Sequence, residues 1–186
     1  DGRLDVTFNW DPCFACDGTP DLYVEFELEN AEVDVHDDSV WESDYTFQTG
    51  VWQDFGGGYL DVGAQTPGNA GLMPACHIMT NAMRAWRFTF DNGRDTPKVD
   101  YQWPDNDGCG ACYDDGLEEG YIDSSREWNE NTIVHEFGHH WVNTFAVITE
   151  PDYCNGFCDP DPPDDCGHCR WCRETDHDAF NEGFPN

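Results

Sequence analysis

The sequence predicts an α+β protein, with an N-terminal antiparallel β-sandwich over residues 1–65 and a second domain over residues 70–186. Residues 21–35 alternate apolar and polar side chains, which is the period of two that half-buried strands show. From Pro74 onward the apolar side chains recur at helical spacing instead, and residues 129–148 form a second apolar helical stretch. The stretch 63–71, which contains three glycines and a proline, separates the two patterns and is the expected linker.

Local signals support each part of this prediction. In the first part Leu22, Val24 and Phe26 alternate with acidic or aromatic neighbours, and shorter apolar pairs follow between turn residues. Such regular spacing is typical of a small sandwich of the immunoglobulin-like or transthyretin-like kind. In the second part Pro74 suits the first turn of a helix, and residues 99–103 alternate as a strand.

The charge of the chain excludes several classes of partner. Its 186 residues carry 39 Asp and Glu against 8 Lys and Arg, a formal net charge of −31. Nucleic-acid binding rests mainly on Lys and Arg that neutralise phosphates, so no nucleic-acid partner is expected. Anionic lipid surfaces are excluded for the same reason, and no apolar run approaches the ~20 residues of a membrane span.

The acidic excess has two interpretations. The first is a solvated surface that keeps the protein in solution, as in proteins adapted to a salty medium. The second is binding of Ca²⁺ by clustered carboxylates, a metal that takes oxygen ligands. The candidate clusters are Asp34, Asp37 and Asp38 near the N-terminal strands, and Asp159, Asp161, Asp164 and Asp165 near the C-terminus.

Ten cysteines in so short a chain indicate an oxidising compartment and a disulfide framework. The chain begins at Asp1 without a visible signal peptide, as a processed mature protein would, so we expect a secreted, extracellular protein. The alternative interpretation is metal binding, because several cysteines have the CxxC spacing of zinc sites. These are Cys13 and Cys16, Cys109 and Cys112, and Cys166, Cys169 and Cys172, the last group together with His168.

The most informative segment is an HExxH motif inside the expected helix 129–148. Residues four apart lie on one helix face, so His135 and His139 can share a metal ion. Two neutral imidazoles and a carboxylate suit zinc, and Glu136 next to the first ligand can take a proton from a water at the fourth position. The buried side of the helix is expected to consist of Ile133, Val134, Phe137, Trp141 and Phe145.

A third protein ligand must come from elsewhere in the chain. A second helix is expected near residues 175–184, where Asp178 and Glu182 are four apart and share a face. The residues alone leave several downstream candidates open: Glu150, Asp152, His168, Glu174, Asp176, His177, Asp178 and Glu182.

The runs HEFGHH at 135–140 and NEGF at 181–184 resemble the gluzincin class of zinc metallopeptidases. The resemblance implies a zincin-like mixed sheet, an HExxH active helix and a second helix that bears a ligand. It implies His135, His139 and Glu182 as zinc ligands, Glu136 as general base, and Asp178 as a partner that orients a ligand histidine. It also implies that residues 121–124 form the edge strand that holds an extended peptide.

The sequence departs from this class at its end. Gluzincins continue beyond the ligand glutamate into a helical subdomain with a Tyr or His that stabilises the oxyanion, whereas this sequence ends four residues after Glu182. The C-terminal subdomain is therefore expected to be missing. By residue type alone, the substitutes are His140, Tyr153, His168 and His177.

The sequence therefore predicts a secreted zinc metalloendopeptidase that acts on a peptide or protein substrate. The alternative is an extracellular structural or filament-forming subunit, which keeps the metal site without turnover, assembles with itself and binds calcium on its acidic surface. The intact Glu136 favours the first hypothesis, because a purely structural site has no need of a general base.

Overall fold

The computed structural model describes residues 7, 18–39, 41, 43–106 and 109–146. The chain divides into two compact units, and each is described by itself. The first contains Asp1–Phe26 and Thr46–Gly68, and the second contains Glu27–Tyr45 and Asn69–Asn186. Helices and strands are both present, so the predicted α+β class is confirmed. The chain passes from the first unit to the second between Gly68 and Asn69, which lies within the expected linker 63–71.

The first unit is held together by a small two-stranded sheet, formed by β1 (Glu25–Glu27) and β3 (Thr46–Gln48). The rings of Phe26 and Phe47 stack on it, with centroids 4.7 Å apart and planes at 9°. Among the described residues of this unit, the named strands form this one sheet and no second sheet. A sandwich needs two packed sheets, so the N-terminal sandwich stays a prediction.

The second unit is built on a four-stranded mixed sheet with the order β2-β4-β6-β5. Its strands are β2 (Val33–His36), β4 (Val99–Gln102), β5 (Ala111–Asp114) and β6 (Glu119–Ile122). β2, β4 and β6 run parallel, and β5 pairs antiparallel with β6. β2 lies in the segment that the sequence pattern assigned to the sandwich, and its register with β4 places it in this sheet instead.

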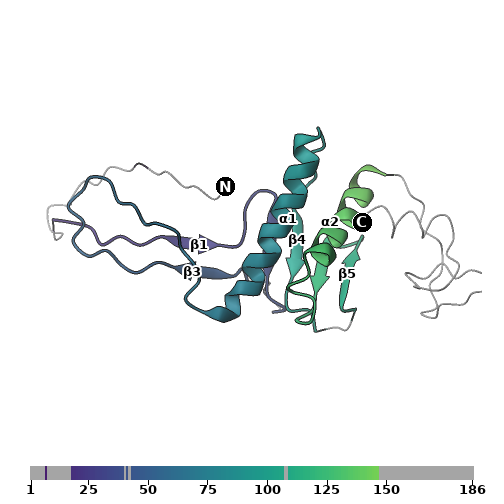
Figure 1. Ribbon diagram of the computed structural model, residues 1–186, viewed down its shortest axis with the longest axis horizontal. Helices are drawn as coiled ribbons and strands as arrows, with labels where there is room; N and C mark the ends of the chain where they lie inside the picture. Colours follow the sequence, from purple (N-terminus) through teal and green to yellow (C-terminus); the bar gives the residue numbers. More distant parts are fainter. Residues whose placement is uncertain (1–6, 8–17, 40, 42, 107–108, 147–186) are drawn as a thin grey trace, which may run out of the picture. The chain divides into compact units, whose positions relative to one another are not determined.

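Two helices pack beside this sheet (Figure 1). A single turn, η1 (Ala70–Leu72), leads into α1 (Met73–Asp91), which has Pro74 in its first turn as predicted, and α2 is Glu130–Phe145. Neither helix of the described residues is long and apolar enough to cross a membrane. Both helices contribute to one apolar core with the strands, which includes Ile78 and Ala82 of α1, Ile133 and Phe137 of α2, and Val33, Val35, Val99, Tyr101 and Ile122 of the sheet.

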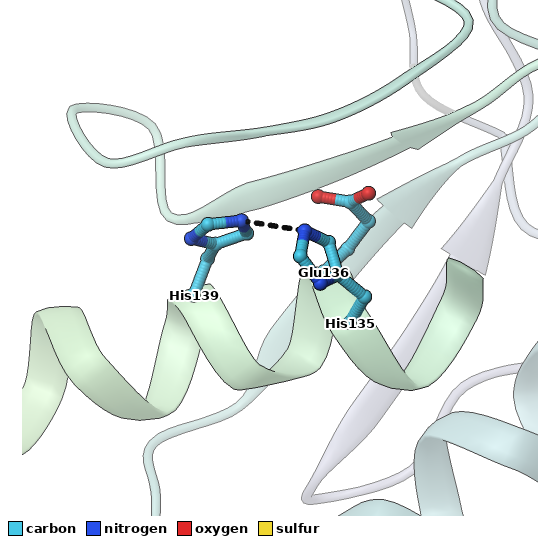
Figure 2. Close-up of side chains that lie close together, drawn as sticks. All are labelled: His135, Glu136 and His139. Carbon is cyan, nitrogen blue, oxygen red and sulfur yellow. Dashed lines mark hydrogen bonds between the residues drawn. The ribbon is translucent and has the colours of Figure 1, made fainter. Parts of the chain in front are cut away.

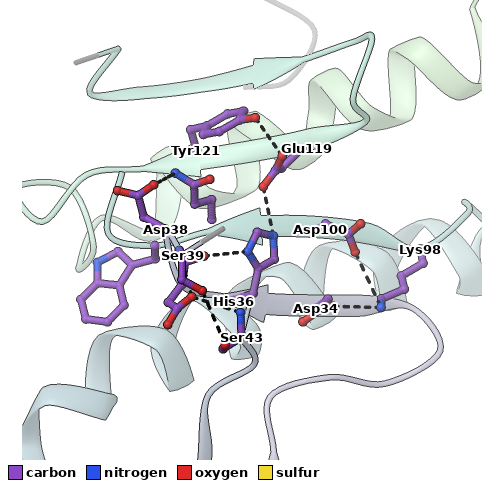
Figure 3. Close-up of polar contacts among 12 residues, drawn as sticks. Asp34, His36, Asp38, Ser39, Ser43, Lys98, Asp100, Glu119 and Tyr121 are labelled. Atoms are coloured by element: carbon purple, nitrogen blue, oxygen red, sulfur yellow. Dashed lines mark hydrogen bonds and ion pairs between the residues drawn. The ribbon is translucent and has the colours of Figure 1, made fainter. Parts of the chain in front are cut away.

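The opposite face of the sheet is polar, because successive side chains of a strand point to opposite faces. His36 of β2 is 4% exposed and its Nε2 lies 3.0 Å from Glu119 Oε1 of β6. Tyr121 Oη donates to the same carboxylate at 2.8 Å, and Lys98 Nζ lies 3.0 Å from Asp34 (Figure 3). Paired charges thus link β2 to β6 across the intervening β4.

The pKa values of this pair predict a pH window for stability. Burial opposes the charge on His36, but hydrogen bonds to Glu119 and the Asp37 carbonyl outweigh it and raise the pKa of His36 to about 9. Burial likewise opposes the Glu119 charge, and the bonds from His36 and Tyr121 outweigh it, so its pKa is lowered from 4.5. The pair therefore stabilises fully between about pH 4.5 and 6.5. This stabilisation falls as the pH rises through 9 or drops through the lowered pKa of Glu119.

We expect His36→Gln to cost on the order of 2 kcal/mol inside this window, since one pKa unit corresponds to about 1.4 kcal/mol, and progressively less toward pH 10. Urea unfolding of the wild type and the variant from pH 4 to 10 measures the difference in their free energies of unfolding. Because both proteins are compared at each pH, the effect of overall charge cancels. A difference that does not change with pH would contradict the pairing.

Candidate metal centre

Helix α2 begins where the sequence predicts it. Asn129 is the N-cap, and its side-chain oxygen accepts a hydrogen bond from the Thr132 amide at 3.3 Å. Ile133 and Phe137 are buried at 0% and 2% exposure, as predicted, and fix the orientation of the helix on the sheet. Val134 and Phe145, also predicted to be buried, are 37% and 36% exposed. The covered side of α2 is therefore narrower than its apolar residues suggest.

The two motif histidines converge as the spacing predicts. The Nε2 atoms of His135 and His139 lie 3.1 Å apart, with ring centroids 4.7 Å apart and perpendicular ring planes. Two nitrogens bound to one tetrahedral zinc at about 2.0–2.1 Å would be about 3.3 Å apart, so this spacing fits a shared ion. Both residues are half-buried.

Glu136 completes the group. Its carboxylate and the two imidazoles each offer a ligand atom, and these atoms all lie within 4.8 Å of one another. Figure 2 shows the three side chains rising from the same side of α2. Glu136 is only 4% exposed, and its charge contributes, after burial, to the raised pKa of Tyr101 on β4. A buried carboxylate beside two imidazoles is the donor set that a divalent metal and a general base require, so the residues present fit zinc.

His140 has a different role from the histidine before it. It is fully buried, and its Nε2 lies 3.1 Å from the Pro97 carbonyl oxygen, to which it donates. Its Nδ1 then accepts from Tyr113 Oη at 2.9 Å. Burial is the main cause that lowers the pKa of His140, so the ring is neutral at pH 7. With both ring nitrogens bonded, His140 holds α2 against β5, so neither nitrogen is left for the oxyanion that its residue type alone suggested.

The edge of the sheet also differs from the prediction. Residues 121–124 were expected to form the edge strand, but β6 lies between β4 and β5, and β5 is the edge among the described strands. The hairpin of β5 and β6 explains the shift, because Asp114 Oδ1 accepts from the amides of Gly116 and Leu117 and closes the turn. The sequence pattern did not predict β5 as a strand, because this segment is short and polar.

Two of the predicted site residues belong to the part of the chain that the structure does not describe. Glu182 and Asp178, the predicted third ligand and its neighbour, lie outside the described residues, as do Tyr153, His168, His177 and the acidic cluster 159–165. The described structure therefore brings His135, Glu136 and His139 together, and the third ligand stays a prediction.

The calcium candidates near the N-terminal strands bind other groups. Asp34 contacts Lys98, Asp37 Oδ1 accepts from the amides of Ser39 and Ser43, and Asp38 accepts from Asn106. A separate group of carboxylates, from Glu27, Glu29 and Asp44, has ligand atoms within 4.8 Å of one another. Glu29 lies 2.6 Å from Lys98 Nζ, so a cation already faces this group, and calcium binding stays a prediction.

The described cysteines support the disulfide interpretation in part. Cys109 and Cys112 are bonded to each other, whereas Cys76 is a half-buried free thiol. The pair 109–112 is thus a disulfide rather than half of a zinc site. The remaining cysteines lie outside the described residues. Comparison with protein-family models, with curated proteins and with solved structures finds no match to this chain.

Proposed function

We propose that this chain is a secreted zinc-dependent metalloendopeptidase. The observation that supports the proposal most is the 3.1 Å separation of His135 Nε2 and His139 Nε2 beside the buried carboxylate of Glu136. One disulfide among the described cysteines is compatible with an extracellular protein. Glu182 is the third ligand in this proposal and Asp178 is the partner that orients a ligand histidine, on the strength of the resemblance of the NEGF run.

Each group has a defined task in this proposal. Zinc, when bound, polarises a peptide carbonyl and lowers the pKa of water. His135 and His139 hold the metal through their Nε2 atoms. The carboxylate of Glu136 accepts a proton from the attacking water and then gives that proton to the nitrogen of the departing amine. Its burial at 4% exposure keeps this carboxylate fixed and partly shielded from bulk water.

The substrate is a peptide held in extended form. β5 pairs with β6 on one side, and its other side is not paired with any described strand. The backbone amides and carbonyls on that side can hold a peptide by strand addition, the mode in which main-chain hydrogen bonds supply affinity. α2 packs on β5 and β6, so the strand and the histidines belong to neighbouring elements.

The test is metal-dependent hydrolysis by the full chain. We expect casein cleavage to be lost after treatment with 1,10-phenanthroline and dialysis, and to return on addition of one equivalent of Zn²⁺. Added Ca²⁺ is the control and is expected not to restore cleavage. Hydrolysis that persists without metal, or a zinc-loaded chain without hydrolysis, would contradict the proposal, and the second result would favour the structural-subunit alternative.

A further inference from the structure

A feature outside the metal group is the disulfide between Cys109 and Cys112, at the start of edge strand β5. We infer that it is a reactive disulfide, which exchanges with external thiols and disulfides, and that Asp105 is the proton acceptor for Cys109. This inference does not depend on peptidase activity.

The disulfide adds little to the stability of the fold. It closes a loop with a sequence separation of only three, and the stabilisation from loop closure grows with loop length. The same segment is already fixed by backbone pairing, because the Asp123 amide donates to the Gly110 carbonyl at 2.8 Å and Cys112 lies opposite Tyr121 in the β5–β6 ladder. The disulfide is therefore not needed to hold this segment in place, so it can be broken and re-formed in the folded protein.

The two sulfurs differ in accessibility. Cys109 is exposed and Cys112 is half-buried, so an external thiol or disulfide meets Cys109 first. Exchange requires a thiolate that can approach along the sulfur–sulfur axis, and therefore depends on access and on deprotonation. The exposed cysteine is thus the one that forms the mixed disulfide.

A buried carboxylate lies beside that exposed sulfur. Asp105 is 5% exposed, and its Oδ2 lies 3.5 Å from Cys109 Sγ. Its backbone amide donates to the Ile122 carbonyl at 2.8 Å, which fixes its position at the end of β6. Arg126 and Asp123 lie beside Gly110, one of the two residues between the cysteines, because a Cβ added there would lie 3.3 Å from Arg126 Nε and 3.6 Å from Asp123 Oδ2. Asp105 thus supplies a proton acceptor within reach of the Cys109 sulfur.

The exchange balances with an external disulfide as the oxidant. Asp105 takes the proton of the reduced Cys109, and the thiolate attacks one sulfur of the external disulfide, whose other sulfur leaves as a thiolate and is protonated by water. Cys112 then loses its proton to water, its thiolate attacks Cys109 Sγ, and the second external sulfur leaves as a thiolate that water protonates, while Asp105 returns its proton to water. Two protein thiols are oxidised to one disulfide, and one external disulfide is reduced to two thiols.

The experiment follows this pair in the folded full chain. The protein is reduced with dithiothreitol, freed of reductant, and reoxidised with oxidised glutathione at pH 7. Samples are blocked with N-ethylmaleimide, and mass spectrometry of the peptide that holds both cysteines gives the reoxidation rate at this site alone. We expect Asp105→Asn to slow reoxidation about a hundredfold, the low end for loss of a positioned base. Asp95→Asn, an exposed carboxylate elsewhere in the same unit, is the matched control and is expected to keep the wild-type rate.

Two outcomes would overturn the inference. If dithiothreitol reduces the pair only after denaturation, the disulfide is structural. If Asp105→Asn, with an unchanged circular dichroism spectrum, reoxidises at the wild-type rate, Asp105 is not the proton acceptor. Should Asp105→Asn fail to fold, the reduction of the folded wild-type protein still decides whether the disulfide is reactive.

Discussion

Replacement of Glu136 with Gln is expected to lower kcat/KM for peptide hydrolysis by about a thousandfold, within the range that loss of a general base produces. The amide keeps the shape of the side chain but cannot accept the proton of the attacking water. Zinc content is expected to stay unchanged, because His135 and His139 still present their Nε2 atoms 3.1 Å apart. Initial rates on a fluorogenic peptide, with zinc content measured on the same samples, check both expectations.

Glu130→Gln is the matched control, since Glu130 is exposed in the first turn of the same helix. We expect it to retain wild-type activity within about twofold, as surface substitutions usually have small effects. Equal activity of Glu136→Gln and the wild type would remove Glu136 from the mechanism. Equal loss in both variants would indicate damage to α2 rather than to the chemistry.

Replacement of His140 with Ala is expected to be the most destabilising change near the site, at about 3 kcal/mol. It removes a fully buried ring and leaves the hydroxyl of half-buried Tyr113 and the carbonyl of exposed Pro97 without this partner. Zinc is nevertheless expected to remain bound, because neither ring nitrogen of His140 belongs to the metal group. Urea unfolding of the zinc-loaded protein measures the loss.

Val134→Ala provides the comparison on the same helix, since Val134 is 37% exposed and is expected to change stability by less than about 0.5 kcal/mol. If His140→Ala instead lost zinc and kept its stability, the last histidine of the HEFGHH run, His140, would be the ligand and the assignment of His139 would be wrong.

Much of the site was predictable from sequence because it depends on one helix. The spacing of His135 and His139 fixes their convergence wherever a helix forms, and Asn129 supplies a cap that starts it. The helix from Pro74 and the strand at 99–103 were predictable for the same reason, since their periods are local properties of the chain.

The remainder depends on contacts between distant segments. The register that pairs Val33 with Val99 joins β2 to a sheet whose other strands lie more than 60 residues later, and no local period indicates it. Likewise, His140 differs from His139 only through its contacts with Tyr113 and Pro97, which belong to other elements. Helical spacing places apolar side chains on one side of α2, but only the neighbouring elements decide that Val134 stays exposed.

The central claim is that His135 and His139 bind one metal ion. Elemental analysis of the purified full chain after zinc loading and gel filtration tests it most directly, with the His135→Ala/His139→Ala double variant measured alongside. We predict one zinc per wild-type chain and none in the variant. The same zinc content in both proteins, or zinc that is lost when the cysteines are blocked and not when the histidines are replaced, would contradict the claim.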